Sequence, residues 1–537
     1  MKRTIAILLC GLLCAASTLR AAQPAPQPHA EKWWVGIISQ GQLMPVAENF
    51  RADLAGDSFG NQVQPLLLSD RGNIVWSEEP FAFEIRDGRV EVGQARGEVI
   101  RLRAGETLRD ACRYASQHFF PPQGKLPDPL FFAAPQYNTW IELIYNQNQR
   151  DILNYAEAII DHGFPPGVLM IDDNWQEDYG KWEFHAGRFP DPKAMVARLH
   201  ELGFKVMLWV CPFVSPDSDV FRDLLARGAF LTEAAPATLG NALPSETTGA
   251  AAPRIVSWWN GYSAVLDLSN PVAEAWLHDR LGRLQREYGI DGFKFDAGDA
   301  EYYTGGASCG GVSANTQSEL FGRVGLRYPL NEYRAMWKMG GQPLVQRLRD
   351  KSHSWGDLRK LVPSMNLAGM MGYPFCCPDM VGGGEFTSFL EGAPIDQELI
   401  VRSAQCHALM PMMQFSAAPW RILDERHFAA IEKCVALRQR FADYIFEEAQ
   451  RSATTGEPIM RCMEYAWPGM GYAECGQQFM IGERLLVAPV VEKGVAQMRI
   501  LLPRGRWRGF DGRKYKGPAA IDVEVDLETL PYFERID

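Results

Sequence analysis

The sequence has few of the residues and motifs that mark metal and cofactor sites. It contains nine His and eleven Cys among 537 residues, with no CxxC pair and no HExxH motif. Zinc ribbons, thioredoxin-like sites and zinc metalloproteases need these motifs, so the sequence excludes them. No GxxxxGK[ST] or GxGxxG motif opens a helix, and nucleotide binding is therefore not indicated. We expect no metal and no organic cofactor.

Basic residues are also in the minority. The chain has 54 Lys and Arg against 65 Asp and Glu, a formal net charge of −11. Nucleic acids and anionic membranes bind positively charged surfaces, so we expect neither as a partner. With 47% hydrophobic and 22% charged residues, the composition is that of a globular protein. At roughly 100–200 residues per domain, the length allows several domains or one large barrel with satellites.

Long apolar runs are absent after the N-terminus. Two basic residues precede a short apolar run over 4–16, and small residues follow it, which is typical of a secretory signal over 1–22. That run is too short to span a membrane, and no later segment holds 18 consecutive uncharged apolar residues. We therefore predict an exported protein, periplasmic or secreted, without a membrane span. A lipoprotein would carry its lipid on Cys10 or Cys14, but both follow a bulky Leu where a small residue is expected.

The hydrophobic pattern changes twice along the chain. Over 32–125 it is strand-like, and residues 81–86 and 89–92 alternate with period two around an Asp-Gly turn, so we predict an N-terminal β-sandwich domain. Over 128–445, short apolar runs alternate with helical stretches, which is typical of a parallel sheet. We predict an α/β fold there, a catalytic (β/α)8 TIM barrel. Short strands return over 450–537 and predict a C-terminal β domain.

Asp296 directly follows the apolar strand predicted over 292–295. The helix before this strand is predicted to start at Asn270, a good N-cap followed by Pro, and to run to about Tyr288. In a (β/α)8 barrel, residues at the carboxyl ends of the strands face the active site. A carboxylate at the end of an apolar run is costly unless it is partnered or functional. Asp296 is therefore a candidate catalytic residue, and capping of the next helix is the alternative.

Two further carboxylates, Asp172 and Asp173, follow another apolar run, and Trp175 comes shortly after them. Trp209 lies near the end of the next apolar run. Sugar hydroxyls bind carboxylate oxygens, and the apolar face of a sugar packs on an aromatic ring. We predict that these four residues bind substrate. For the two carboxylates, a hydrogen-bonded pair in a loop is the alternative.

Several motifs occur in a fixed order along the chain. RFPDPK at 188–193 comes first, DLSNP at 267–271 and KFDAGD at 294–299 follow, and LLVAPV at 485–490 comes near the end. Their order and spacing resemble those of glycoside hydrolase family 31, a family of retaining α-glycosidases, over most of the chain. KFDAGD is similar to a branch in which the nucleophile lies in K-x-D-x-G-E.

The resemblance implies a mechanism with two carboxylates. Asp296 stands at the position of the family's nucleophile. Asp350 stands at the acid/base position, five residues before Trp355, although Arg349 and Lys351 replace the Gly and Asn that flank it in the family. Without the resemblance, Asp350 would be interpreted as part of a charged surface turn. The mechanism needs Asp350 protonated while Asp296 is ionised, so we expect the higher pKa at Asp350.

Two basic residues complete the predicted site. Lys294 precedes the nucleophile by two positions, and Arg334 lies where the family often has an Arg that binds substrate. We predict both as substrate-binding residues. For Lys294, an ion pair inside the barrel is the alternative.

The segment 411–416, PMMQFS, departs from the family pattern P-F-x-R-x-H. Gln414 replaces the Arg, and Ser416 replaces the His that contacts a glucose hydroxyl. The combination is similar to a branch whose animal member resembles an α-galactosidase. We predict an exo-α-glycosidase for oligosaccharides or glycosides that favours α-galactosides, with Gln414 in its substrate site. An α-glucosidase, an α-xylosidase and a non-catalytic carbohydrate-binding protein remain alternatives, and the sequence leaves the oligomeric state open.

Overall fold

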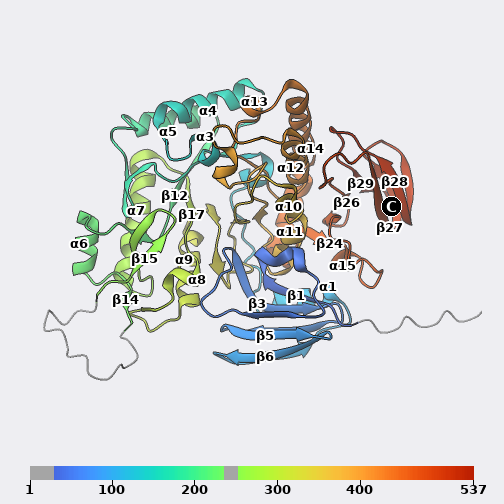
Figure 1. The fold of residues 1–537 in the computed structure, drawn as a ribbon, viewed down its shortest axis with the longest axis horizontal. Coiled ribbons are helices and arrows are strands. Elements are labelled where there is room, and N and C mark those ends of the chain that lie inside the picture. Colours follow the sequence, from blue (N-terminus) through green and yellow to red (C-terminus); the bar gives the residue numbers. More distant parts are fainter. Residues whose placement is uncertain (1–29, 235–251) are drawn as a thin grey trace, which may run out of the picture. The chain divides into compact units, whose positions relative to one another are not determined.

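The computed structural model of the chain describes residues 30–234 and 252–537. The predicted signal over 1–22, with Cys10 and Cys14, lies outside the described residues. The predicted fold class is confirmed: a parallel α/β barrel is flanked by N-terminal sheets and by an all-β C-terminal part (Figure 1). None of the helices in the described part combines the length and apolar character that a membrane span requires.

The barrel is a ring of eight parallel strands that pair in chain order. Its strands are β8 (Gln136–Asn138), β9 (Val168–Ile171), β12 (Lys205–Val210), β17 (Gly292–Phe295), β19 (Leu330–Tyr333), β21 (Gln346–Arg347), β22 (Cys376–Cys377) and β23 (Gln414–Phe415). β23 pairs with β8 at one end of the strand order. An isolated bridge between Met380, shortly after β22, and Gln414 of β23 connects the two edge strands, so the ring is nearly closed. These strands are buried on both faces, as parallel strands between helices and a filled interior must be.

Helices alternate with these strands along the chain. The longer ones are α4 (Gln149–Asp161), α5 (Pro192–Glu201), α6 (Asp219–Ala226), α7 (Pro271–Tyr288), α9 (Ala314–Val324), α11 (Leu361–Met370), α12 (Gln397–Ala408) and α14 (Glu425–Thr455). Short ones are α2 (Leu130–Ala133), α3 (Trp140–Leu143), α8 (Ala300–Tyr303), α10 (Trp355–Leu358), α13 (Pro419–Ile422) and the 3₁₀ turns η2 (Gly325–Arg327) and η3 (Phe386–Phe389). The prediction for α7 is confirmed, since the side chain of Asn270 accepts a hydrogen bond from the backbone N of Val272 and Pro271 opens the helix.

The N-terminal part is a sandwich of two antiparallel sheets. One contains β1 (Trp33–Ile37), β3 (Gln62–Ser69), β4 (Asn73–Ser77) and β7 (Val99–Arg103), and the other contains β2 (Phe50–Asp53), β5 (Phe81–Arg86) and β6 (Arg89–Ala95). Apolar side chains from both sheets form one core, which includes Val35, Val75 and Ile85. The predicted hairpin is present as β5 and β6, and Asp87 and Gly88 in its turn have φ values of 48° and 73°.

This sandwich is joined to the barrel through the backbone. β20 (Met336–Trp337), in the loop that follows β19, pairs in parallel with β3 of the sandwich. The turn η1 (Ile38–Leu43) packs against α11 of the barrel, and α1 (Leu108–His118) follows the last strand of the sandwich. Loops of the sandwich therefore lie next to the carboxyl ends of barrel strands.

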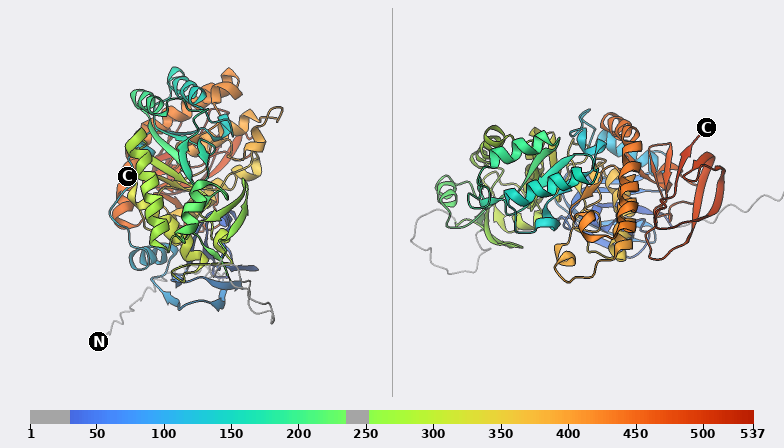
Figure 2. Two further views of the ribbon diagram at one scale, coloured as in Figure 1. Left: turned by 90° about the vertical axis from the view of Figure 1, so that its left-hand side faces the viewer. Right: turned by 90° about the horizontal axis from the view of Figure 1, so that it is seen from above.

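The C-terminal part is a six-stranded sheet. It contains β24 (Met460–Cys462), β25 (Phe479–Ile481), β26 (Leu485–Val487), β27 (Gln497–Gly509), β28 (Lys514–Glu524) and β29 (Tyr532–Arg535), with α15 (Met463–Ala466) after β24. The long helix α14 stands between the barrel and these strands (Figures 1 and 2). From α14, Arg440 donates hydrogen bonds to Tyr532 at 2.9 Å and to Glu534 at 2.7 Å.

Smaller sheets extend the barrel loops. β10 (Gln176–Asp178) and β11 (Lys181–Phe184) form a hairpin, β13 (Phe213–Val214) pairs with β16 (Gly261–Val265) of the hairpin that β16 forms with β15 (Ile255–Trp258), and β14 (Thr232–Glu233) pairs with β18 (Gly306–Ala307). The turn between β15 and β16 contains Trp259 and Asn260, and both contact residues of the site described below.

Candidate active site

A cavity of about 560 Å³ lies at the carboxyl ends of the barrel strands. Its lining includes seven of the nine predicted site residues: Asp172, Asp173, Trp209, Lys294, Asp296, Arg334 and Asp350. It also includes residues that were not among the predicted site residues, namely Gly60, Trp140, Tyr145, Trp259, Asp299, Tyr302, Arg347, Arg349, Glu385 and Phe386. Its volume is that of a small-molecule site, and carboxylates, basic groups and aromatic rings share its wall.

Asp296 stands at the carboxyl end of β17 with both carboxylate oxygens engaged. Oδ1 accepts hydrogen bonds from Nε of Arg334 at 2.7 Å and from the backbone N of Ala297 at 2.8 Å. Oδ2 accepts one from Nε1 of Trp209 at 3.1 Å. Burial alone would raise the pKa of Asp296, but the charges of Arg334 and Lys294 outweigh it and hold that pKa well below its ordinary value. Asp296 is therefore an ionised carboxylate in a fixed orientation.

Arg334 follows β19 and connects two carboxylates. Its Nε donates to Asp296, while Nη1 and Nη2 donate to the two oxygens of Asp299 at 2.9 and 2.5 Å. Nη1 also donates to the carbonyl of Gly60 at 3.0 Å, and the guanidinium lies 5.5 Å from the ring centroid of Trp259. These contacts place Arg334 beside the carboxylate of Asp296, where it also faces the cavity.

Lys294 and the two carboxylates after β9 form a second charged group. Nζ of Lys294 donates to Oδ2 of Asp172 at 2.5 Å, and both side chains are almost fully buried. Asp173 accepts hydrogen bonds from Nδ2 of Asn260 at 2.5 Å and from the hydroxyl of Tyr179 at 3.3 Å. Burial, together with the charge of Asp172, raises the pKa of Asp173 to about 7. The ion pair given as the alternative for Lys294 is present and lies in the cavity wall, and substrate binding by Lys294 stays a prediction.

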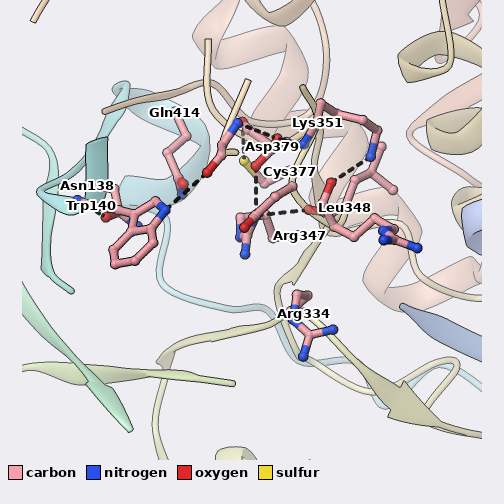
Figure 3. Close-up of polar contacts among 12 residues, drawn as sticks. Asn138, Trp140, Arg334, Arg347, Leu348, Lys351, Cys377, Asp379 and Gln414 are labelled. Carbon is pink, nitrogen blue, oxygen red and sulfur yellow. Dashed lines mark hydrogen bonds and ion pairs between the residues drawn. The ribbon is translucent and has the colours of Figure 1, made fainter. Parts of the chain in front are cut away.

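Arg347, the last residue of β21, holds Asp350 and Asp379. Its buried Nη1 donates to Oδ1 of Asp350 at 2.6 Å and to Oδ1 of Asp379 at 2.7 Å. The backbone N of Lys351 donates to the second oxygen of Asp379 at 2.8 Å. Figure 3 shows Arg347, Lys351 and Asp379 close together and Arg334 apart from them. Burial raises the pKa of Asp379 to about 6, against the opposing charge of Arg347. The Asp350 side chain is 41% exposed, so it is open to a ligand while Asp379 is a buried anchor.

A single side chain of the N-terminal sandwich holds three backbone positions of the site. Nδ2 of Asn61 donates to the carbonyl oxygens of Arg334 at 2.7 Å and of Arg347 at 3.0 Å. Its Oδ1 accepts a hydrogen bond from the backbone N of Arg349 at 3.1 Å. Asn61 is fully buried, so the sandwich fixes the ends of two barrel strands and the loop that carries Asp350.

Two family models match this chain. The model described as the TIM-barrel domain of glycosyl hydrolases family 31 matches residues 131–343 and 345–448. The model described as the C-terminal domain of glycosyl hydrolase family 31 matches residues 456–537. The chain belongs to glycoside hydrolase family 31. The resemblance deduced from the ordered motifs is thereby confirmed.

The relatives of this chain differ in what their names describe. The myogenesis-regulating glycosidase of Mus musculus is 34% identical over 450 residues, which are 81% of this chain and 60% of the mouse protein. The SITS-binding protein of Tetronarce californica is 27% identical over 62% of this chain and 48% of its own length. An α-xylosidase of Emericella nidulans is 25% identical over 76% of this chain and 53% of its own length. The chain thus spans 60% or less of each of these relatives.

Solved structures of family 31 share the fold. A dextranase of Flavobacterium johnsoniae complexed with glucose has a TM-score of 0.78 at 18% identity and covers 95% of this chain, which covers 65% of the dextranase. An α-xylosidase from a soil metagenome, complexed with xylose, has a TM-score of 0.78 at 21% identity, with 95% of this chain and 78% of the other covered. At such low identity, these similarities concern the fold alone.

The structure corrects the prediction for Trp175, which does not line the cavity. Its side chain is fully buried, and its Nε1 donates to the carbonyl of Trp209 at 2.8 Å. Its ring packs against Trp182 and Phe184 on the hairpin β10–β11. Asn174 has a φ of 73°, which turns the chain away from the cavity directly after the carboxylates of β9.

The structure also corrects the prediction for Gln414. Gln414 is fully buried inside the barrel, where its Nε2 donates to Oε1 of Gln136 and to Oε2 of Glu332, both at 2.9 Å. It belongs to β23 itself rather than to the loop after it, so its side chain joins the packed interior layer and not the cavity wall. Ser416 is fully buried too, and its Oγ accepts a hydrogen bond from the backbone N of Ile141 at 2.7 Å.

Some of the additional residues at the cavity carry a signal in the sequence. Arg347 ends a barrel strand, as the rule that selected Asp296 requires, but its strand is only two residues long and has no clear pattern. Trp259 precedes an Asn-Gly pair, the strongest short signal of a hairpin turn. Asn61 and Gly60 carry no such signal, because only the pairing of the sandwich with the barrel brings them to the site.

Metal independence is a prediction that the structure leaves for experiment. Across residues 30–234 and 252–537, no group of three or more His, Cys, Asp or Glu is placed to hold a metal ion. We expect hydrolysis of an aryl α-glycoside to keep its full rate after dialysis against EDTA. A loss of rate that one divalent ion restores would contradict this expectation.

Proposed function

We propose that this chain is an exported, retaining exo-α-glycosidase that prefers α-galactosides to α-glucosides. The observation that carries the proposal is the presence of Asp296 and Asp350 in the lining of one cavity. Asp296 is held ionised by Arg334 and Lys294, and the side chain of Asp350 is open to the cavity. Retaining glycosidases place one carboxylate as the nucleophile and a second as the acid/base beside the scissile bond.

The reaction would proceed in two displacements. In the first, a carboxylate oxygen of Asp296 bonds to the anomeric carbon while the glycosidic oxygen leaves with the proton of Asp350. In the second, Asp350 takes a proton from water, the water oxygen bonds to the anomeric carbon, and the carboxylate of Asp296 is released. Trp209 and Arg334 hold the nucleophile for attack, and the carboxylates of Asp172 and Asp173 face the sugar hydroxyls.

The proposed preference for galactosides rests on two glucose-binding side chains that the cavity wall lacks. The Arg and His of the usual glucose-binding pattern are Gln414 and Ser416 here, and both side chains are buried and engaged away from the cavity. Contacts specific to a glucose hydroxyl are thus missing from β23. Hydrolysis of α-xylosides and hydrolysis of α-glucosides are the alternative activities, because one relative is named an α-xylosidase (Emericella nidulans) and another an α-glucosidase (Bacillus thermoamyloliquefaciens).

We expect an aryl α-galactoside to be cleaved with a higher kcat/KM than the matching α-glucoside and α-xyloside. A polar contact that is missing from a buried site can change such ratios by several powers of ten, so a difference of roughly tenfold or more is expected. The measurement uses 4-nitrophenyl glycosides, which share one leaving group and differ only in the sugar. A higher kcat/KM for the glucoside or the xyloside would contradict the preference and leave the two-carboxylate mechanism standing.

A carbohydrate-binding protein without catalysis is the second candidate, because the carboxylates and aromatic rings of the cavity wall suit binding of a sugar whether or not it is cleaved. Turnover of any glycoside in the same screen separates the two functions. Export is proposed from residues 1–22 of the sequence, and fractionation of the source cells tests it.

A further inference from the structure

A second cavity, of about 550 Å³, adjoins the first. One side of it is formed by the N-terminal part of the chain, with Gln40 in the turn η1 and Phe59 in the loop between β2 and β3. Three residues line both cavities: Arg349, Asp350 and Glu385. The carboxylate proposed as the acid/base therefore stands in a wall that the two cavities share.

Arg349 has a fixed backbone and a free side chain. Its backbone N donates to Oδ1 of Asn61 at 3.1 Å, and its carbonyl accepts from Nζ of Lys351 at 2.6 Å. Its guanidinium is exposed, and no residue within 30–234 or 252–537 pairs with it by a hydrogen bond or an ion pair. The other basic groups of this cavity are engaged, since Lys360 pairs with Asp357 at 2.5 Å and Lys351 bonds to Arg349. Five N–H donors are thus available at the shared wall.

The second cavity has the composition of a site for a neutral polar ligand. Four carboxylates and three basic residues line it, so an anionic ligand would meet more negative than positive groups. Gln40 and Gln42 add amide groups, and Phe59 adds an aromatic ring. Phe59 has a φ of 51°, a strained conformation for a bulky residue, and its backbone N donates to Oδ1 of Asp57 at 2.6 Å. Amide groups, and carboxylate oxygens that accept hydrogen bonds from hydroxyls, suit a sugar when an aromatic ring lies beside them.

A retaining glycosidase must hold its leaving group on the far side of the acid/base, where this second cavity lies. We propose that Arg349, which replaces the Gly of the family pattern, selects a neutral hexose as that leaving group by donating hydrogen bonds to its hydroxyls. The inference rests on the proposed function, because an acid that protonates the glycosidic oxygen must have the cleaved sugar on one side and the leaving group on the other. Asp350 has the first cavity on one side and the second on the other. Arg349, directly before Asp350, would then select the leaving group without taking part in proton transfer.

The test compares two substrates with the same glycone. An α-galactosyl fluoride has a leaving group that fills none of the second cavity, whereas an α-galactosyl hexose disaccharide fills it. In Arg349→Gln, we expect kcat/KM for the disaccharide to fall roughly 10- to 100-fold, as the loss of a charge-assisted hydrogen bond implies. The value for the fluoride should fall far less. Arg359→Gln is the matched control, because Arg359 is exposed nearby and lines neither cavity; it should reproduce wild-type kinetics on both substrates.

The outcomes separate this inference from the proposed function. Equal losses on the fluoride and the disaccharide in Arg349→Gln would contradict the inference, because Arg349 would then act on the glycone or on Asp350. Unchanged kinetics on both substrates would contradict it as well. If the wild type cleaves neither substrate, the proposed function fails, and calorimetric titration with glucose decides the inference. Binding to the wild type that weakens at least tenfold in Arg349→Gln would support it, and equal affinity or no binding would overturn it.

Discussion

Asp296→Ala is expected to abolish hydrolysis of every glycoside, including aryl glycosides with good leaving groups. Without this carboxylate, no covalent glycosyl intermediate can form, and the loss of a nucleophile typically costs roughly 10⁴-fold or more in kcat. A good leaving group cannot restore the rate, because it removes the need for the general acid and not the need for the nucleophile. The measurement is release of 4-nitrophenol at saturating substrate, beside Asp279→Ala, which removes an exposed carboxylate from α7 and should retain the wild-type rate.

A covalent label identifies the nucleophile independently. A fluorinated α-galactosyl donor should trap the glycosyl enzyme, and mass spectrometry should place the label on the peptide that contains Asp296. Circular dichroism should show a folded Asp296→Ala protein, since Arg334 keeps its hydrogen bonds to Asp299 and Gly60. A label on any other peptide would refute the assignment.

Asp350→Ala is expected to separate substrates by their leaving groups. Unactivated disaccharides need protonation of the leaving oxygen and should lose roughly 10²–10⁴-fold in kcat/KM, the usual contribution of general acid/base catalysis. Aryl glycosides with acidic phenols should still form the intermediate, which then accumulates because no base activates water. Azide needs no general base, so it should raise turnover and yield an α-glycosyl azide of retained configuration.

The variants Asp379→Ala and Asp357→Ala are the comparisons for Asp350. Asp379 is buried and anchors Arg347 and Lys351, so its loss should lower stability as well as activity, without rescue by azide. Asp357 pairs with Lys360 and bonds to the backbone N of Ser352, and its loss should have a small effect. Near-normal hydrolysis of disaccharides by Asp350→Ala would remove this residue from the role, and azide rescue of Asp379→Ala would transfer the role there.

Local patterns were sufficient wherever neighbouring residues determine the structure. The hairpin β5–β6 follows from alternation around Asp87 and Gly88, and α7 follows from the cap at Asn270. Asp296 and Asp172 are predicted at the cavity, and line it, because a carboxylate after an apolar parallel strand lies at the open end of a barrel. Each of these inferences needs only the strand or helix and the residue next to it.

The same rule failed where the backbone turns within a few residues. Proximity in sequence groups Trp175 with Asp172 and Asp173, but the positive φ of Asn174 sends its ring into the core. The family position of Gln414 predicts contact with substrate, yet Gln414 bonds to Gln136 and Glu332 inside the barrel. Orientation of a side chain depends on one or two dihedral angles, and sequence pattern does not supply them.

Sequence patterns are enough to predict the barrel, the β domains beside it, the family and the carboxylate at the end of β17. These depend on hydrophobic periodicity, turn signals and ordered motifs, all of which are local properties of the chain. Three further features depend on the folded arrangement: Arg347 joins Asp350 to Asp379, Asn61 of the sandwich fixes this loop, and Arg349 stands between two cavities. Such contacts link residues far apart in the chain, and they exist only after the sandwich has paired with the barrel through β3 and β20.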